Sequence, residues 1–414
     1  MALNEKLRHN LGIYITYFIL ISFLNPRGFY GVIPGYKPFF TLMTWISCLL
    51  IGIYLVSNFI DNRRLFRKLD ILIAFNFALV VLITIIDQKG IHEGLQQMLA
   101  FPMICMFVII KVRKNPIRFL NKINNILIVL FCLNLVISKL YPFEYHATFL
   151  GHVQMIAQLG LVSIFTCFVV VLLKHQFEKK NVAQLAITLL NLLFTDAFTA
   201  IIVLVLCVGF IALFIFQHKF HKVYQVFLKK PVIYFLVFLV LDILFIVVSC
   251  NTTVLDKVIN GRGIIWREAF DSIKSSWLLG YGIQGVLMKP FWLEGTSSNG
   301  FNYAHNQLVQ ILLDGGIVLL ISMLTTFWFV LQNIKKSNVE YLYLVNTTMI
   351  TVLSLMIVDA PSIYCYIYIY ISMIYALHVK SGGKYHGIDQ SHTKEFFKKI
   401  LSLPNKKGGR KSWR

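Results

Sequence analysis

Charged residues are scarce in this chain, and acidic residues are scarcer than basic ones. Charged side chains make up 14% of the 414 residues, hydrophobic ones make up 57%, and the mean hydropathy is +0.72. Soluble globular domains carry about 25% charged residues, so the composition excludes that class and indicates an integral membrane protein. The sequence also lacks a nucleotide-binding P-loop and a repeat of solenoid period, which argues against an ATP-driven pump and against a solenoid.

Cysteine residues are also few, and their positions suggest no shared function. The seven cysteines occur singly and show no zinc-like spacing. We therefore expect neither a disulfide framework nor a metal centre, and no motif calls for a cofactor.

Long apolar runs are abundant, and a membrane-spanning helix needs about 20 mainly apolar residues. Such runs predict an all-α polytopic membrane protein with about twelve transmembrane helices. They lie at 11–25, 39–60, 69–86, 95–110, 123–138, 152–173, 182–195, 197–216, 232–250, 306–331, 341–358 and 361–378. The break between 182–195 and 197–216 is very short, so these two runs could instead form one bent helix, which would invert the topology of everything after them.

The basic residues test the topology. With a cytoplasmic N-terminus and twelve spans, 30 of the 39 Lys and Arg residues fall on cytoplasmic segments, as the positive-inside rule requires. We therefore expect both termini to be cytoplasmic in a multi-pass protein of the cytoplasmic membrane. The net charge of +21 then faces anionic membrane lipids rather than nucleic acid.

This topology divides the chain into four parts. Residues 1–250 form an N-terminal bundle of about nine spans, and 251–305 form one large extracytoplasmic loop. Residues 306–378 add about three spans, and 379–414 form a basic cytoplasmic tail. The tail either lies in the membrane interface as a short amphipathic helix or remains disordered.

The large loop contains a helical stripe of aromatic and aliphatic residues. Trp266, Phe270, Ile273 and Trp277 recur every three or four residues, which places them on one helix face. Arg267 lies on another face and is placed to pair with the residue four positions on, Asp271. We expect this amphipathic helix to lie in the lipid head-group layer.

Arg262 precedes this helix and has a glycine on each side. A guanidinium can pair with two phosphate oxygens, and the neighbouring backbone amides would add donors. The alternative is that the Arg262 side chain only extends to lipid head groups.

Gly280 and Gly282, with Gly285, match the spacing of a dinucleotide-binding fingerprint. No strand precedes them, so we interpret the glycines as a turn that follows the surface helix.

His305 and Asn306 lie at the start of the run 306–331. Asn is a favoured N-cap residue, so the helix is predicted to begin there. The positive end of the helix dipole favours a neutral His305 imidazole, which could accept a proton from a hydroxyl. The alternative is a histidine that anchors the chain at the interface.

Polar groups inside the predicted spans are few. Asp314 follows Asn306 by about two turns, and the adjacent Gly315 and Gly316 allow close helix approach. Asp242 lies mid-span, where a carboxylate is a candidate ion-coupling residue of a transporter. The tyrosines 364, 366, 368 and 370 have period two and are explained by packing and interface anchoring.

These features together resemble the O-antigen polymerase and O-antigen ligase superfamily, which includes the Wzy-type polysaccharide polymerases. The resemblance rests on the topology with one large late loop and on the order of motifs within it. Those motifs are Arg262 before Trp266, the pair Gly280 and Gly282, and His305–Asn306 followed by a glycine pair.

The resemblance implies a metal-independent glycosyltransferase that acts on the outer face of the membrane. It would polymerise undecaprenyl-diphosphate-linked repeat units into capsular polysaccharide, exopolysaccharide or O-antigen. Arg262 and His305 would be the catalytic residues, and Trp266, Arg267, Gly280, Gly282 and Asn306 would bind substrate. Partners would include the flippase and the chain-length regulator of such a pathway.

One departure from the family pattern concerns a second cation. The family usually carries an Arg at the outer start of a mid-chain span, where this chain has 195–199, TDAFT. The second cation would then have to come from Lys139, Arg27, Lys257 or Arg267. Three alternatives to a polymerase remain at this stage: a ligase with another acceptor, a flippase or transporter that uses Asp242, and a non-catalytic scaffold of an envelope assembly.

Overall fold

The computed structural model describes residues 2–87, 91–143, 147–174, 176–215, 231–252, 261–289, 300–334 and 339–381. The basic tail from 382 onward and Lys257 therefore lie outside the described residues. The helices are α1 (Ala2–Phe23), α2 (Tyr36–Asp61), α3 (Lys68–Asp87), α4 (Ile91–Lys114), α5 (Pro116–Leu140), α6 (Val153–Lys174), α7 (Lys179–Leu193), α8 (Phe198–Ile215), α10 (Pro231–Asn251), α12 (Arg262–Ser275), α13 (Gln307–Ile334), α14 (Val339–Val358) and α15 (Cys365–Ser381). Two 3₁₀ turns, η1 (Arg63–Leu65) and η3 (Pro361–Ile363), and a short antiparallel pair, β1 (Ala147–Thr148) and β2 (Gly151–His152), complete the described structure.

The protein is a mostly helical, polytopic membrane protein, as the sequence predicts. Each of the twelve predicted apolar segments coincides with a helix. Six of these helices are long and apolar enough to cross a membrane, namely α2, α3, α5, α6, α10 and α13, and shorter apolar helices lie within α1, α14 and α15. The segments 182–195 and 197–216 correspond to two separate helices, α7 and α8, rather than to one bent helix.

Helix α6 forms the centre of the bundle. Of its most apolar 18-residue window, 83% is buried, and α5, α7, α8, α14 and α15 all pack against it. Its apolar residues surround the whole helix axis, which is the pattern of a fully buried helix. Polar side chains add specificity between α5, α6 and α7, where the Gln184 amide donates to Asn124 and Ser163 and the Asn134 amide donates to Asn191.

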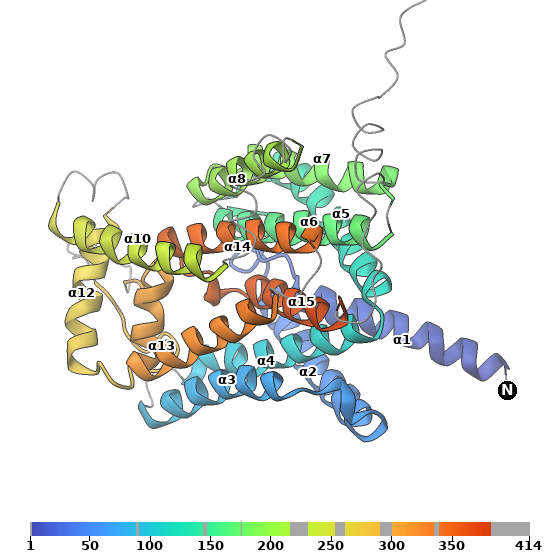
Figure 1. Ribbon diagram of the computed structural model, residues 1–414, viewed down its shortest axis with the longest axis horizontal. Coiled ribbons are helices and arrows are strands. Elements are labelled where there is room, and N and C mark those ends of the chain that lie inside the picture. The colour runs from blue at the N-terminus through green and yellow to red at the C-terminus, as the bar shows by residue number, and fades with distance from the viewer. Residues whose placement is uncertain are drawn as a thin grey trace, which may run out of the picture.

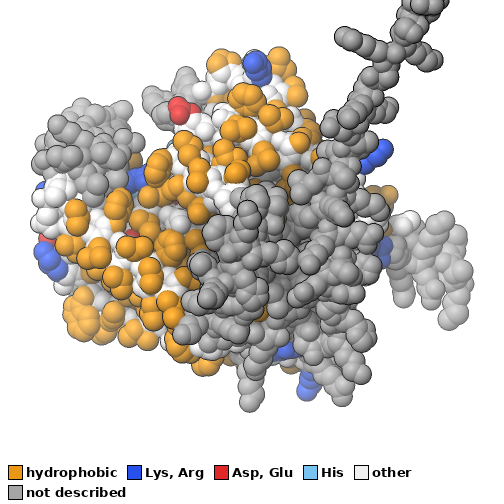
Figure 2. Space-filling model, turned by 45° about the horizontal axis from the view of Figure 1, so that its top comes forward, with side chains coloured by type: hydrophobic (Ala, Val, Ile, Leu, Met, Phe, Trp, Pro, Cys, Tyr) orange, Lys and Arg blue, Asp and Glu red, His pale blue; other side chains and the backbone are white. Residues whose placement is uncertain are grey.

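The surface matches a lipid environment. Many large apolar side chains of α2, α8 and α10 are exposed, including Leu49, Val205 and Leu244. Figure 2 shows hydrophobic side chains spread over the visible described surface, with Lys and Arg mostly near its edges. A surface of this kind is stable only when lipid tails cover it.

The two ends of the bundle differ in charge. One end, here called the basic end, carries the basic residues of the α2–α3, α4–α5 and α6–α7 connections, such as Arg63, Lys114 and Lys179. The other end, here called the site end, carries α12 and the loops around it. Figure 1 shows α12 and the first part of α13 running across this end, at a steep angle to α10 and α14.

The structure shows the packing of α12 and corrects one expectation about its charged residues. The apolar face of α12 packs on α10 and α13, where it forms a second small core. Trp266 is fully buried there, whereas Trp277 is 59% exposed. Asp271 pairs with Lys274 at 2.8 Å rather than with Arg267, which is exposed.

Helix α13 is not the single continuous span expected over 306–331. Gly316 has φ +58° and ψ −159°, a conformation that only glycine adopts readily, and the helix changes direction there. The first part, up to Gly315, belongs with α12 at the site end. The second part, from Ile317 onward, runs along the bundle (Figure 1).

Candidate functional site

Several segments that are distant in sequence meet at the site end. The segment after α1 contacts the β1–β2 hairpin, where the amide of Arg27 donates to the carbonyl of Leu150 at 3.1 Å. The Arg27 guanidinium lies 5.8 Å from the ring centre of Tyr364, which follows η3. The loop that ends at His305 and the start of α12 complete the same cluster.

Arg262 is the first residue of α12. Gly261 precedes it as the N-cap residue, with φ +76°, a left-handed conformation that glycine adopts without strain. The Arg262 guanidinium donates to the carbonyl of Val358 at the end of α14. Burial lowers the pKa of Arg262, and the neighbouring Asp359 opposes this effect. Arg262 therefore remains a fixed cation held close to a buried carboxylate.

Trp266 positions the loop that carries His305. Its indole N–H donates to the carbonyl of Ala304 at 2.7 Å, and its ring packs edge-on against Phe245 at 5.9 Å. Because the side chain is fully buried, the structure gives Trp266 a positioning role beside the site.

His305 occupies a strained and half-buried position. Its φ is +51°, which is uncommon for a residue with a side chain, and its ring centre lies 4.1 Å from that of Tyr303. Burial, together with the positive charge of Arg262 and the proximity of His152, lowers the pKa of His305 to about 3. Burial and the Arg262 charge, rather than the helix dipole considered from the sequence, therefore favour the neutral imidazole. Its buried Nδ1 has no hydrogen-bond partner among the described residues, and a buried polar atom of this kind marks a candidate ligand site.

This burial predicts an acid-sensitive fold. The folded pKa of His305 lies below its unfolded value of about 6.5, so the unfolded chain binds the proton more tightly. The stability that neutral His305 confers is complete above about pH 6.5 and is lost as the pH falls toward 3. When the pH falls from 7 to 5, we expect protonation of His305 in the unfolded chain to lower the free energy of unfolding by about 2 kcal/mol. Thermal unfolding of the purified protein, followed by tryptophan fluorescence, should show this loss, and His305→Gln should reduce it. An equal loss in both proteins would contradict the assignment.

Asn306 caps α13, as the sequence predicts. Its side-chain oxygen accepts from the amide of Val309 at 3.0 Å. Its amide nitrogen donates to Asp242 Oδ1 at 2.7 Å and to the carbonyl of Ile357 at 3.0 Å. Asp242 is a candidate ion-coupling residue in the sequence. In the structure its carboxylate fixes Asn306, the residue that joins His305 to α13.

The bond between Asp242 and Asn306 gives a prediction that separates the two roles of Asp242. Asp242→Ala removes one acceptor of the Asn306 amide. This change lowers the free energy that keeps Asn306 and the start of α13 in place by about 2 kcal/mol, so we expect activity to fall about 30-fold. Asp242→Asn keeps an acceptor oxygen of the same size, so we expect activity near that of the wild type. Steady-state transfer rates of the two purified variants provide the test. Equal, severe losses in both would instead favour ion coupling.

Gly280 and Gly282 lie in the turn expected from the sequence, and both have positive φ. The structure gives them a packing role. A Cβ on Gly280 would approach the carbonyl oxygen of Leu313 to 2.5 Å, and one on Gly282 would approach the Thr84 hydroxyl to 2.5 Å. The turn therefore fits between α13 and α3.

The same turn satisfies the backbone groups that the break in α13 leaves free. The amides of Tyr281 and Gly282 donate to the carbonyls of Leu313 and Asp314. The amide of Ile317 donates to the carbonyl of Trp277 at 2.9 Å. An interrupted helix at membrane depth needs such partners, because lipid offers none.

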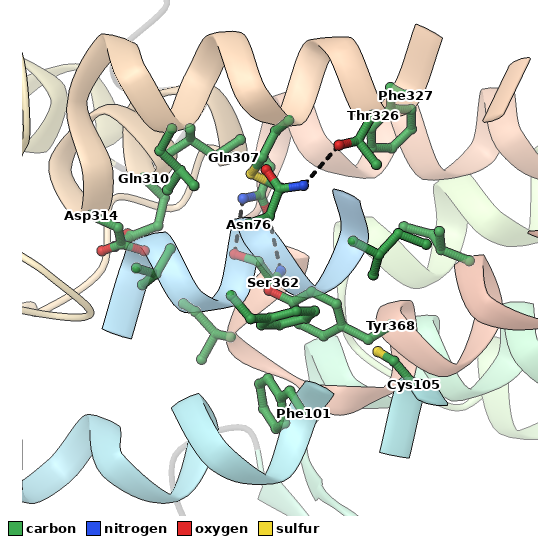
Figure 3. A pocket seen from close by; sticks show the side chains of 18 of the residues that line it. Asn76, Phe101, Cys105, Gln307, Gln310, Asp314, Thr326, Phe327, Ser362 and Tyr368 are labelled. Carbon is green, nitrogen blue, oxygen red and sulfur yellow. Dashed lines mark hydrogen bonds between the residues drawn. The ribbon is translucent and has the colours of Figure 1, made fainter. Parts of the chain in front are cut away.

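A cavity of about 140 Å³ lies beside the broken helix, between α3, α4, α13 and α15. Its walls are mostly apolar, and its polar residues include Gln307, Gln310, Asp314 and Ser362. Gln307 and Ser362 exchange two hydrogen bonds, at 2.9 and 3.0 Å. Figure 3 shows Asp314 and Gln310 at one end and Thr326 and Phe327 farther along α13. The cavity thus extends from residues next to His305 into the bundle.

Of the four residues considered for the second cation, only Arg27 lies in the described cluster. Arg267 is exposed on α12, Lys139 is exposed near the end of α5, and Lys257 is outside the described residues. Sequence reasoning missed Tyr303, Tyr364 and the Gln307–Ser362 pair. Neither tyrosine carries a local signal: Tyr303 stands alone in its loop, and Tyr364 begins a regular tyrosine spacing that continues into α15 and is equally typical of packing.

Asp359 is a further member of the cluster. It is 2% exposed and lies close to Arg262 and Tyr364. Burial raises its pKa to about 6, although the Ala360 amide and Arg262 act in the opposite direction. Its contact with Arg262 depends on the tertiary fold, so no local pattern in the sequence reveals it.

Comparison with protein families identifies one related segment. Residues 183–324 match the model of a family described as O-antigen ligase. The match includes Arg262, Trp266, His305, Asn306 and Gly316, and it confirms the resemblance to the O-antigen polymerase and ligase superfamily. It indicates a membrane enzyme that transfers glycosyl groups, with lipid-linked oligosaccharides as the substrate class. The comparison with curated proteins found no match.

Proposed function

We propose that this protein, as its likeness to the O-antigen ligases and polymerases suggests, transfers a glycan from a polyprenyl-diphosphate carrier to a hydroxyl of another carrier-linked repeat unit. One observation carries the proposal. A fixed cation, Arg262, lies close to a histidine, His305, whose buried Nδ1 has no partner among the described residues. The apolar cavity begins two residues further along the chain, at Gln307. The residue pair suits a reaction in which a diphosphate leaves and a hydroxyl attacks.

Arg262 is placed to stabilise the leaving group. The bond from the sugar anomeric carbon to the diphosphate oxygen breaks, and negative charge develops on that oxygen. A preorganised guanidinium, together with the positive end of the α12 helix dipole, stabilises such charge without reorganisation. The carbonyl of Val358, which Arg262 contacts now, keeps the side chain oriented.

His305 is placed to accept the proton of the attacking hydroxyl. The new bond joins the acceptor oxygen to the anomeric carbon, and the hydroxyl proton passes to the imidazole. A pKa of about 3 makes His305 a weak base in the free protein. A bound diphosphate would neutralise part of the Arg262 charge and so favour the protonated imidazole when substrate is present.

Arg27 is our proposal for the second cation. It reaches the cluster from the segment after α1, and Tyr364 lies between it and Asp359. This location differs from that of the family arginine, which the segment 195–199 lacks. A cation on the other side of the site would serve the second phosphate of the carrier.

The apolar cavity is suited to the isoprenoid part of the carrier. Its walls come from α3, α13 and α15, and it continues from Gln310 past Phe327 to Val330. The first isoprene units of such a chain would lie along these apolar walls, with the diphosphate beyond Gln307, toward His305 and Arg262. This arrangement supports a lipid-linked donor.

The cellular setting follows from the charge distribution. The basic end would face the cytoplasm, and the site end would face outward from the cytoplasmic membrane. The reaction would then polymerise repeat units of a capsular polysaccharide, an exopolysaccharide or O-antigen, with a flippase and a chain-length regulator as partners. The O-antigen ligase description of the matching family keeps ligation to another acceptor as the second candidate.

The experiment is a deletion strain complemented with wild-type protein or His305→Ala. Polymer length on a gel and the location of lipid-linked repeat units are measured. Loss of polymer with single repeat units on the outer leaflet would support a polymerase. Normal repeat-unit polymer that fails only to reach its final acceptor would identify a ligase. Repeat units trapped on the inner leaflet, with normal function of His305→Ala, would identify a flippase and contradict the proposal.

A further inference from the structure

A second cavity lies at the basic end, far from the site described above. It has a volume of about 310 Å³ and lies at the elbow between α4 and α5, here called the elbow pocket. Figure 1 shows this elbow beside α1, at the opposite end of the bundle from α12. The pocket residues are Gly12, Ile13 and Thr16 of α1, Tyr54 of α2, and Lys111, Lys114, Asn115, Arg118, Phe119 and Lys122 of the elbow.

Four of these ten residues are basic, and none is acidic. The Lys111 ammonium lies 4.2 Å from the ring centre of Tyr54, and the Lys122 ammonium lies 5.6 Å from that of Tyr17. Aromatic faces thus hold these two cations in place. The three ion pairs found in the described part of the chain do not include Lys111, Lys114 or Lys122.

The helix geometry adds to the positive potential. Helix α5 begins in the pocket with Pro116, and the side chain of Asn115 caps it by accepting from the amide of Arg118 at 3.2 Å. The positive end of the α5 dipole therefore adds to the four cationic side chains. Like charges held this close repel one another, so a bound anion would relieve an unfavourable arrangement.

The surroundings of the pocket indicate the source of the anion. Ile13 and Phe119 give it apolar walls, and no described atom lies within 4 Å of a Cβ built on Gly12, so the α1 side is open among the described residues. On the same helix, Leu11 is 57% exposed and Tyr14 is 70% exposed. The open side is therefore next to a surface that lipid tails would cover.

We propose that the elbow pocket binds the phosphate group of an anionic lipid head group, with the acyl chains along α1. Basic pockets between helices at the cytoplasmic end of membrane proteins bind such head groups. The elbow pocket has four basic residues and no acidic one. The site at the other end of the bundle differs, because there Arg262 lies close to the carboxylate of Asp359. The proposal does not depend on the reaction proposed above.

The test is native mass spectrometry of the purified full-length protein with phosphatidylglycerol or phosphatidylcholine. We expect the wild type to prefer phosphatidylglycerol. Each basic residue near a lipid surface contributes about 1 kcal/mol, so Lys111→Gln with Lys122→Gln should reduce the preference about 30-fold. The double variant Lys111→Arg and Lys122→Arg keeps both charges and should keep the preference, which controls for loss of fold.

A second arm separates lipid from soluble phosphate. Excess inorganic phosphate should leave most of the phosphatidylglycerol bound, because the acyl chains add affinity that the free ion lacks. Equal binding of the two lipids, or a preference that survives the glutamine pair, would overturn the proposal. Full displacement of the lipid by inorganic phosphate would also overturn it, in favour of a site for a soluble phosphate. The matched control is Lys274→Gln on α12, an exposed basic residue at the other end, which should change nothing.

Discussion

Alanine at Arg262 or at His305 is expected to reduce glycan transfer at least about 100-fold while leaving membrane insertion intact. Removing one preorganised donor that stabilises transition-state charge costs a factor of about 100 to 1,000 in enzymes. Loss of the proton acceptor has an effect of similar size. Both side chains lie at the site end rather than within a lipid-facing span, so the variants should still insert.

The measurement is the initial rate of transfer with purified protein, together with the elution profile of a fluorescent fusion in detergent. Arg262→Lys keeps the charge but loses the planar fork, so its rate should lie between those of the wild type and Arg262→Ala. Lys274→Ala, on the exposed side of the same helix, should match the wild type. Wild-type rates from both site variants would remove Arg262 and His305 from the reaction.

Gly316→Ala should abolish activity through the break in α13. An alanine at φ +58° and ψ −159° is strained by about 1–3 kcal/mol. Its Cβ would also lie 2.4 Å from the backbone carbonyl of Leu278. The turn that carries Gly280 and Gly282 would have to move away from α13, and the cavity beside it would lose its wall at Ile283.

Transfer rate and thermal unfolding of Gly316→Ala measure these two effects. The matched control is Gly209→Ala on α8, because no atom lies within 4 Å of a Cβ built there. Alanine should be neutral or slightly stabilising at that helical position. If Gly316→Ala were as active and stable as Gly209→Ala, the break in α13 would not be needed for function.

The sequence predicts the helices of this protein well because their signal is local. A run of about 20 apolar residues has few alternatives in a bilayer, and each such run coincides with a helix in the described chain. The cap at Asn306 was equally predictable, because the preference of asparagine for the residue before a helix is a local property.

The orientation of α12 was not predictable from its periodicity. The stripe that contains Trp266 and Ile273 has the same pattern whether it faces lipid or protein. What decides between them is the contact of Trp266 with Phe245 on α10 and with the carbonyl of Ala304. Both partners are distant in sequence, so no local pattern reveals them.

Part of the site was predictable from the sequence, because some of its residues carry a local signal. Arg262 and His305 stand out because charged and ionisable residues are rare in this chain. Asp359 and Tyr364 reach the cluster from the α14–α15 connection and Arg27 from the segment after α1, and only the packed fold brings them together. The glycine pair at 315–316 predicted close approach to a neighbour, but the break depends on the carbonyls of Trp277 and Leu278.

The most direct test of the central claim uses purified protein in proteoliposomes with one substrate, a polyprenyl-diphosphate-linked repeat unit, in the presence of a chelator and without nucleotide sugars. The wild type should convert the single units into a ladder of longer lipid-linked chains with release of polyprenyl diphosphate. His305→Ala should leave the single units unchanged. Unreacted single units with correctly folded wild-type protein, or the same ladder from His305→Ala, would contradict the account.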